Sequence, residues 1–428
     1  MARAGLLPLG APRWSIGSCV EKKKCAQTIS LGHGDSSRSE HIFEDLNDLV
    51  PEGIQNELDR LMPLPHQTNT EKQSAYQQMG QVLSANEDQL FSDTHAAKCI
   101  KHNDMCPVRD IWQHGQAGQQ LRIWVAGSSC VDFSKRGKRS KDSGTSMRPW
   151  RIFVALVRKG RPHILLHEIT VCKVALTLLK QELGDLYKIS SARITPVDLG
   201  YPADRPRQFS VCCLRGSVEY SGTWEKFYSI FGRQLSTSGA SLFQGDRAYQ
   251  EEVMRSRARS FGHHYDVGKV PQIEACLSPS AYGRHLRYQQ LQPSDCWDDG
   301  SFFYDTDQNP EFNSYSGVIP TLCSHGTLVS GSTLEVAGGL QHLAIMGDPV
   351  FPHQRAGHPY GCQYQAILDA KVLAESLLKD IAGNSIHEPT LGLLLIFTLG
   401  HTKRVIAALV PAVLADPHES SDGELDLD

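Results

Sequence analysis

Four residues, far apart in the chain, have side chains that together could carry out one covalent reaction. Cys130 follows an apolar, strand-like run, Glu168 ends a second such run, and Arg205 and Arg207 precede a third. A thiolate is a nucleophile, a partly buried carboxyl can keep a proton to donate, and paired guanidinium groups bind carbonyl and phosphate oxygens. The residue types therefore predict a nucleophile, an acid and a cationic clamp.

Regular elements surround these residues and must position them. Strands are predicted near Leu121–Ala126, His163–Glu168 and Gln208–Leu214, and helices over Pro149–Lys159 and Val171–Leu183. Strands that alternate with helices predict an α/β fold with a parallel, doubly wound sheet. Ligands bind such sheets outside the carboxyl ends of the strands. The thiol and the acid are both predicted at that edge.

In order and type, these segments resemble the catalytic centre of the DNA cytosine-C5 methyltransferase family. That family reads Pro-Cys-x-x-Phe-Ser at the thiol loop, Glu-Asn-Val at the acid and Gln-Arg-Arg-x-Arg at the arginines. The corresponding segments here read Ser129-Cys-Val-Asp-Phe-Ser134, Glu168-Ile-Thr170 and Ala203-Asp-Arg-Pro-Arg207. The resemblance implies a methyltransferase fold that uses S-adenosylmethionine, together with a smaller, irregular target-recognition domain.

The implied reaction is methyl transfer from S-adenosylmethionine to C5 of cytosine in DNA. Cys130 would add to C6 of the base, and Glu168 would protonate N3. Arg205 and Arg207 would hold the base carbonyl and the phosphates around a flipped nucleotide. A basic cluster just after the thiol, at residues 135–141, would favour the thiolate and bind phosphate.

Three positions depart from the family pattern and reduce the expected rate. Ser129 replaces a proline that stiffens the thiol loop, Ile169 replaces an asparagine that braces it, and Asp204 replaces a basic residue. Each site residue also has a purely structural interpretation. Cys130 would then be a buried thiol, Glu168 the cap of the following helix, and the arginines part of a surface turn.

The methyl donor would be held by residues from both ends of the chain. By the resemblance, Glu21 binds the ribose hydroxyls, Asp45 contacts the adenine, and Asn384 with Ser385 closes the pocket. The family's Phe-x-Gly-x-Gly loop is not found, so we expect the sequence to begin after that motif. A donor carboxylate normally rests against such a loop and the helix N-terminus behind it. We therefore expect weak binding of S-adenosylmethionine.

The chain divides by composition into four parts. Residues 1–215 are predicted to form the catalytic domain, with an insertion or surface excursion at about 51–120. Residues 216–317 lose the strand–helix alternation and match the place of a target-recognition domain. Residues 318–415 return to the catalytic domain, and 416–428 form an acidic, disordered tail.

Overall charge does not decide for or against nucleic acid. The net charge of the 428 residues is −4, and the last 13 hold six acids without Lys or Arg; removing those six charges leaves +2. Local patches must therefore supply any nucleic-acid site. The run Arg255–His264 mixes cations with an aromatic residue, which fits either a phosphate-binding loop or a solvated charge run.

Cysteine content and hydropathy indicate the cellular environment in which the protein is expected. Twelve scattered cysteines favour a reducing compartment over a disulfide framework. No run reaches the roughly 18 apolar residues that cross a bilayer, so no membrane partner is expected, and Leu391–Leu399 is predicted to be a core helix. In a eukaryote the expected location is the nucleus, and otherwise the cytoplasm.

Two further alternatives remain open, and a metal site is not predicted. His95, Cys99, His102 and Cys106 contain zinc-ligating residue types but lack a Cys-x-x-Cys pair. The substrate could be tRNA, because the catalytic residues would not differ. The chain could instead be a catalytically weak paralogue that binds DNA or a partner methyltransferase. Target sequence and oligomeric state are not determined by the sequence.

Overall fold

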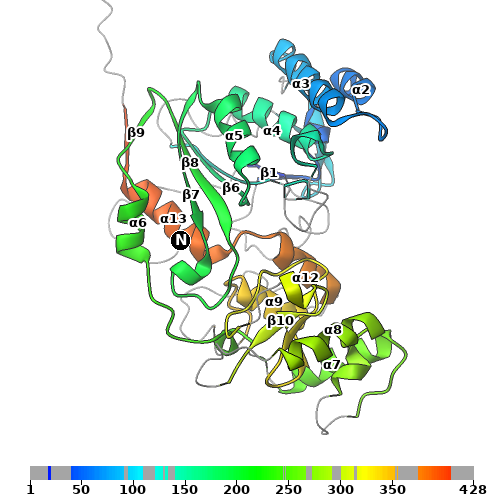
Figure 1. Ribbon diagram of the computed structural model, residues 1–428. Helices are drawn as coiled ribbons and strands as arrows, with labels where there is room; N and C mark the ends of the chain where they lie inside the picture. Colours follow the sequence, from blue (N-terminus) through cyan, green and yellow to red (C-terminus); the bar gives the residue numbers. More distant parts are fainter. Residues whose placement is uncertain are drawn as a thin grey trace, which may run out of the picture.

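The chain folds into an α/β structure in which helices cover both faces of a mixed sheet (Figure 1). The structure is a computed structural model. It describes residues 18–20, 40–90, 95–108, 121–128, 131–133, 140–243, 245, 247–266, 272–291, 300–312, 316–351, 354 and 375–405. The predicted α/β class is confirmed.

The central sheet has four strands in the order β5-β6-β8-β7. Their bounds are Ile123–Gly127 (β5), Ile164–Thr170 (β6), Tyr187–Ile194 (β7) and Arg207–Leu214 (β8). β5 and β6 are parallel, whereas β8 runs antiparallel to both β6 and β7. The prediction of an all-parallel sheet is therefore wrong at β8. A parallel crossover usually needs a helix, and the β7–β8 connection holds only the 3-10 turn Pro196–Asp198.

Side chains on β6 alternate between two helical layers. Leu165 and Ile169 belong to the core beneath α4 (Met147–Gly160) and α5 (Lys173–Leu183). Ile164 and Leu166 face the opposite core, which also holds residues of α6 and α13. A strand covered on both faces reads as a continuous apolar run, as β6 does.

The second layer consists of α6 (Trp224–Phe231) and α13 (Glu388–Gly400), whose Leu394 and Phe397 are fully buried. The predicted core helix at Leu391–Leu399 is thus confirmed. Nearby, β9 (Val218–Tyr220) pairs with β13 (Thr402–Arg404). In the part of the chain that the structure describes, no helix is long and apolar enough to span a membrane.

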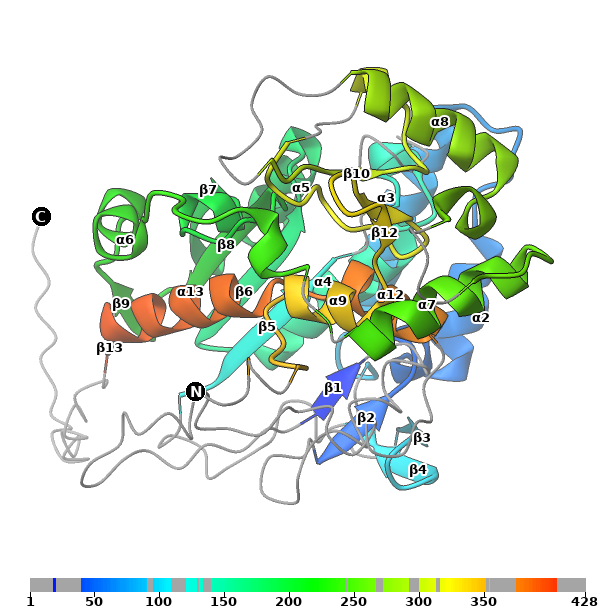
Figure 2. The same ribbon diagram turned by 90° about the horizontal axis from the view of Figure 1, so that it is seen from below.

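A second four-stranded sheet lies at the N-terminal side, in the order β1-β2-β3-β4 (Figure 2). Its strands are Ser18–Val20, His41–Phe43, Ala96–Cys99 and Asp104–Pro107. β1 and β2 are parallel, and β3 and β4 form an antiparallel hairpin that continues the sheet beyond β2.

The region 51–90 is helical and packed, so its prediction as a surface excursion is wrong. It forms α2 (Glu52–Arg60) and α3 (Asn69–Ala85), which begins at a capping box formed by Thr68 and Glu71. Tyr76, Met79 and Leu83 recur at helical spacing and are buried in the core with α4. The many Gln and Ser residues between them conceal this stripe in the sequence.

The remaining part contains helices and a small sheet. The helices are α7 (Arg247–Ser260), α8 (Pro279–Gln290), α9 (Gly339–Ile345) and α12 (Glu375–Asn384); the strands are β10 (Phe303–Asp305), β11 (Leu328–Ser330) and β12 (Glu335–Val336). β10 pairs with β11, so this sheet crosses the boundary predicted at residue 317. The domain boundaries otherwise remain predictions.

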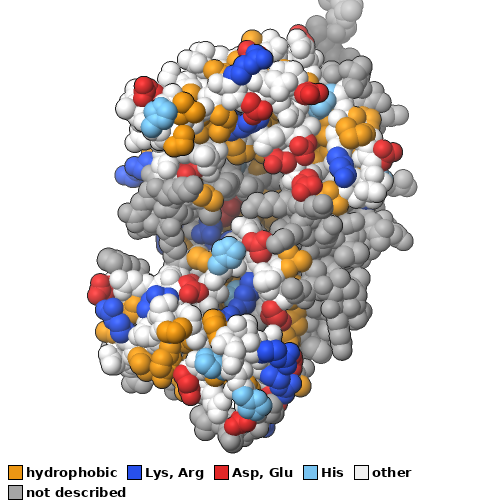
Figure 3. All heavy atoms as spheres, turned by 90° about the vertical axis from the view of Figure 1, so that its right-hand side faces the viewer, with side chains coloured by type: hydrophobic (Ala, Val, Ile, Leu, Met, Phe, Trp, Pro, Cys, Tyr) orange, Lys and Arg blue, Asp and Glu red, His pale blue; other side chains and the backbone are white. Residues whose placement is uncertain are grey.

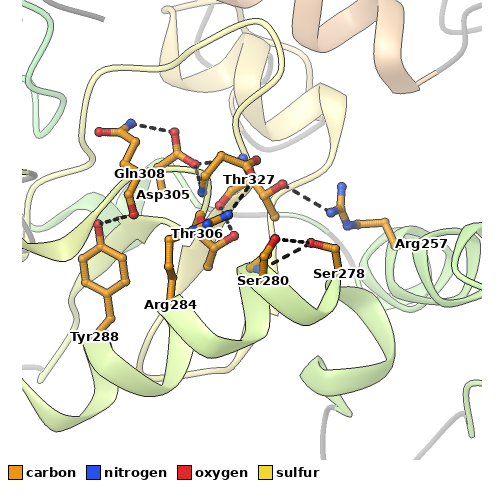
Figure 4. A network of polar contacts seen from close by, with 11 residues as sticks. Arg257, Ser278, Ser280, Arg284, Tyr288, Asp305, Thr306, Gln308 and Thr327 are labelled. Carbon is orange, nitrogen blue, oxygen red and sulfur yellow. Dashed lines mark hydrogen bonds and ion pairs between the residues drawn. The ribbon is translucent and has the colours of Figure 1, made fainter.

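Polar contacts fasten α7 and α8 to this small sheet (Figure 4). Asp305 accepts hydrogen bonds from the Thr327 amide at 3.0 Å and from the Gln308 side chain at 2.6 Å. Arg257 of α7 donates to the Thr327 hydroxyl at 3.3 Å, and Arg284 of α8 donates to the Thr306 carbonyl. These buried bonds fix the helices against the strands.

Candidate functional site

The predicted acid and one predicted arginine meet at one edge of the central sheet. Glu168 pairs with Gly127 across β5–β6, and Arg207 pairs with Thr170 across β6–β8. Arg207 Nε lies 2.8 Å from Glu168 Oε1. Arg207 is the first residue of its strand, so only an antiparallel β8 brings it to the end of β6. Glu168 and Arg207 therefore meet because β8 runs antiparallel to β6. Parallel strands would not bring them together.

The Glu168 carboxyl is buried beside Arg207, and burial and the arginine charges shift its pKa in opposite directions. The residue is 8% exposed, and this burial raises the pKa of the carboxyl, while the charges of Arg207 and Arg205 oppose that rise. Glu168 does not cap the next helix, because α5 begins at Lys173 behind Cys172 without a side-chain cap. A buried carboxyl with a raised pKa can hold a proton near neutral pH and donate it.

The thiol loop leaves this edge from a fixed starting point. The Ser128 amide donates to the Glu168 carbonyl at 3.0 Å, and the Ser128 hydroxyl lies 2.7 Å from His167 Nε2. Gly127 leaves space beside the acid, since a Cβ at this position would lie 3.5 Å from Glu168 Oε2. Cys130 lies outside the described residues, so its position stays a prediction.

The far side of the loop is fixed as well. Asp132 is fully buried, and its carboxylate accepts a hydrogen bond from the Ser146 amide at 2.7 Å. Its carbonyl accepts from the Lys141 amide at 2.9 Å. Phe133, which carries part of the family resemblance, is 7% exposed and belongs to the core with α4. The segment containing the thiol is therefore anchored on both sides.

His167 is a site residue that the sequence analysis missed. Its ring is buried beside Trp150 and Phe153, with ring centroids 5.6 and 5.7 Å away, and burial lowers its pKa to about 4. A neutral imidazole at physiological pH can hold the Ser128 hydroxyl but cannot add charge to the site. The available signal was a histidine next to an acid within an apolar strand.

Arg205 is engaged differently from the predicted clamp. Its guanidinium donates to three backbone carbonyls, those of Leu322 at 3.2 Å, Gly383 at 3.0 Å and Ser385 at 2.7 Å. The residue is 5% exposed. In this structure Arg205 therefore joins chain segments, and of the two predicted clamp residues Arg207 alone contacts the acid.

Of the predicted donor-binding residues, Asn384 and Ser385 lie at the end of α12 and just after it. Asn384 ends α12, is exposed and donates to the Asp380 carbonyl at 2.9 Å. Ile386 follows Ser385, and its Cδ1 would lie 3.7 Å from a Cβ placed on Gly127. The chain after α12 thus lies beside the carboxyl end of β5 at Ile386.

Asp45, a further predicted donor-binding residue, belongs to a different element. It is exposed two residues after β2, where its carboxylate accepts from the Asn47 amide at 2.8 Å. Glu21 falls outside the described residues. Among the described residues, no contact joins Asp45 to Asn384 or Ser385. The two halves of the predicted donor pocket are therefore contributed by separate elements.

The predicted basic run lies at the end of α7. Arg255, Arg259, His263 and His264 line an open hollow there, and basic and histidine side chains gather on the lower part of the face in Figure 3. Arg257 is not part of it, because its guanidinium donates inward to the Cys276 carbonyl at 3.1 Å. Arg255 pairs with Glu252 at 2.7 Å, and Asp266, which also lines the hollow, lies 3.1 Å from His264, so the hollow mixes basic and acidic groups.

No family model matches the sequence, and no curated protein matches it. Among solved structures, the Entamoeba histolytica methyltransferase EhMeth is similar with a TM-score of 0.41 at 10% identity, over 91% of this chain and 99% of that one. S. pombe Dnmt2 methyltransferase is similar with a TM-score of 0.37 at 14% identity, over 65% of this chain and 78% of that one. A Spodoptera frugiperda DNMT2 mutant is similar with a TM-score of 0.33 at 11% identity, over 65% of this chain and 79% of that one. Similarity this loose leaves the function to be argued from the chain's own residues.

Proposed function

We propose that this protein transfers a methyl group from S-adenosylmethionine to C5 of cytosine in DNA. The observation that carries the proposal is the buried Glu168–Arg207 pair, 2.8 Å apart, at the edge from which the thiol loop departs. Burial raises the pKa of the Glu168 carboxyl, which favours the protonated form that a proton donor to a ring nitrogen needs. The order of thiol, acid and arginine along the chain supports the same reaction.

In the proposed mechanism the Cys130 thiolate forms a bond to C6 of the base. Glu168 gives its proton to N3, so the electron pair from the C5–C6 double bond becomes available at C5. When bound, S-adenosylmethionine supplies the methyl group that C5 accepts. Loss of the C5 proton to a base then restores the C5–C6 double bond and expels the thiolate, and N3 returns its proton to Glu168. Arg207 would hold the base carbonyl and keep Glu168 oriented.

The proposed donor site combines Glu21 and Asp45 with Asn384 and Ser385. Asp45 and Asn384 fit this role in part, since each is an exposed polar group at the end of a strand or helix. The Asp45 carboxylate could accept hydrogen bonds from ribose or adenine, and the Asn384 amide could accept or donate them. The hollow lined by Arg255 and Arg259 is the proposed phosphate contact of the target-recognition part.

A second candidate function is a catalytically weak paralogue that binds DNA or a partner methyltransferase. The contacts of Arg205 favour it, because they withdraw one predicted clamp residue from the substrate. A tRNA substrate would use the same residues. The covalent trapping experiment distinguishes a tRNA substrate from a DNA substrate.

The test is covalent trapping on nucleic acid that carries 5-fluorocytosine, with S-adenosylmethionine present. Fluorine blocks the final elimination, so a working enzyme stays attached. We expect DNA adducts with the wild type and with the control variant Cys172→Ala, and none with Cys130→Ala. Equal trapping by the wild type and Cys130→Ala would remove Cys130 from the mechanism. Adducts on tRNA alone would change the substrate, and DNA binding without any adduct would favour the second candidate.

A further inference from the structure

Four metal-ligating side chains that the proposed reaction does not use gather in the N-terminal sheet. Their ligand atoms all lie within 4.8 Å of one another, and they belong to His41, Cys99, His102 and Cys106. Both cysteines are buried, His41 is half-buried and His102 is exposed. Two thiols and two imidazoles form the donor set that zinc takes in structural sites.

Strand register explains why the two cysteines share a face. In the β3–β4 hairpin Cys99 pairs with Asp104, and Ala97 pairs with Cys106. Cross-strand partners point to the same face of a sheet, and side chains alternate along a strand. Ala97 and Cys99 are two positions apart, so Cys106 lies on the same face as Cys99.

The same register adds the two histidines. Phe43 of β2 pairs with Cys99, so it shares that face, and His41 lies two positions before Phe43. His102 lies in the turn between β3 and β4, where Asn103 adopts a left-handed backbone with φ of 53°. The turn brings His102 Nδ1 to 3.1 Å from Cys106 Sγ. Three strands and one turn therefore converge on one point.

The spacing of the ligand atoms suits a tetrahedral ion. With Zn–N of about 2.0 Å and Zn–S of about 2.3 Å, tetrahedral geometry separates neighbouring N and S ligands by about 3.5 Å. The four ligand atoms, none more than 4.8 Å from another, need to move inward by only about 1 Å. Two thiolates would also balance the charge of a divalent ion.

Two further contacts support a bound metal. The Ile42 amide donates to Cys99 Sγ at 3.3 Å, and such a bond both orients a thiolate ligand and stabilises its charge. The β2–β3 pairing is short, with the single residue pair Phe43–Cys99. A metal held by His41 on one side and by the hairpin on the other would reinforce this junction.

We propose that His41, Cys99, His102 and Cys106 bind one structural Zn²⁺ that fastens the β3–β4 hairpin to β2. Four protein ligands leave no open coordination position, so the ion would stabilise the fold and take no part in catalysis. The sequence analysis considered His95 with Cys99, His102 and Cys106 and predicted no metal site, because this set lacks a Cys-x-x-Cys pair. His95 instead contacts the Asp48 carbonyl at 3.2 Å, and His41, 58 positions before Cys99, takes its place.

The test measures metal on the full chain purified under reducing conditions. We expect one equivalent of zinc by elemental analysis, and Co²⁺ in its place should give the absorption bands of a tetrahedral site with thiolate ligands. His102→Ala removes an exposed ligand with little effect on packing. It should weaken zinc binding by at least the 10–100-fold that loss of a second-shell partner costs. Cys106→Ser should remove the thiolate-to-cobalt band or weaken it strongly.

The matched control is His95→Ala, which removes a nearby histidine outside the proposed ligand set. It should bind zinc as the wild type does. Equal zinc affinity in the wild type and His102→Ala would overturn the proposal, as would loss of zinc in His95→Ala alone. A Cys99–Cys106 disulfide that persists under reduction would also overturn it. Each readout is independent of methyl transfer, so the proposed function can fail while the zinc site stands.

Discussion

At the scale of single residues, two opposing effects act on the pKa of Glu168. Burial favours its neutral form, and the adjacent Arg207 favours the charged form; burial is the larger influence, so its pKa is raised. The pair is therefore not a simple ion pair that adds stability. A raised pKa favours proton donation, and the adjacent guanidinium is placed to hold the carbonyl of a base that receives the proton.

We predict that Glu168→Gln abolishes trapping but does not lower stability at neutral pH. An amide keeps the shape of the acid and loses its donatable proton, so the rate of adduct formation should fall by about 10²–10⁴-fold. Rapid-quench measurement of the adduct checks this result. A rate within threefold of the wild type would exclude Glu168 as the proton donor.

Glu168→Gln should also change how the stability of the protein depends on pH. The folded-state pKa of Glu168 lies above its ordinary value of 4.5, so its contribution to stability is complete below pH 4.5. That contribution is lost as pH rises through the raised pKa. Urea unfolding at several pH values should show this decline in the wild type and a flatter profile in Glu168→Gln.

At the scale of elements, the sequence predicted strands β5, β6 and β8 and helices α4 and α5 close to their true bounds. Their apolar runs are long and their ends are well marked, so local pattern was enough. It could not predict β7, whose alternating polar residues resemble a surface segment, or the reversal of β8. It also could not predict the partner of Arg205, because that contact depends on tertiary packing alone.

Arg205 joins elements rather than binding a ligand in this structure. We predict that Arg205→Lys lowers the free energy of unfolding by about 1.5–3 kcal/mol, since a single ammonium cannot span three carbonyls. Trapping should fall as well, because the segment carrying Ser385 and Ile386 covers the end of β5. Chemical denaturation and adduct yield are the two measurements.

Arg233→Lys is the matched control for that prediction. Arg233 also donates to backbone carbonyls, those of Ile230 and Gly232, but these are local and exposed. Its replacement should change stability by less than about 0.5 kcal/mol. If both lysine variants lose the same stability, the long-range contacts of Arg205 have no special role.

At the scale of the whole molecule, charge is distributed unevenly along the chain. The net charge is −4, although removal of the six acids in residues 416–428 would leave +2. A mobile or fixed anionic segment competes with nucleic acid for basic surfaces such as the hollow lined by Arg255 and Arg259. The acidic end should therefore weaken any binding of nucleic acid.

We predict that deleting residues 416–428 strengthens DNA binding by about two- to tenfold at low ionic strength. The gain should disappear near 1 M salt, where the screening length is about 3 Å. Fluorescence anisotropy with a labelled duplex measures both conditions. A chain of full length with the six acids changed to amides should behave like the deletion; if it does not, charge is not the cause.

The bond from Arg205 to Ser385 spans 180 positions of sequence. During synthesis the ribosome would complete the strands carrying Glu168 and Arg207 long before Ser385 is made, at about 5–20 residues per second. The nascent chain would therefore hold the acid and the thiol segment before Ser385 and Ile386 are made. The three backbone contacts of Arg205 would be complete only after about 180 further residues, so the sheet would form well before the site is fully assembled.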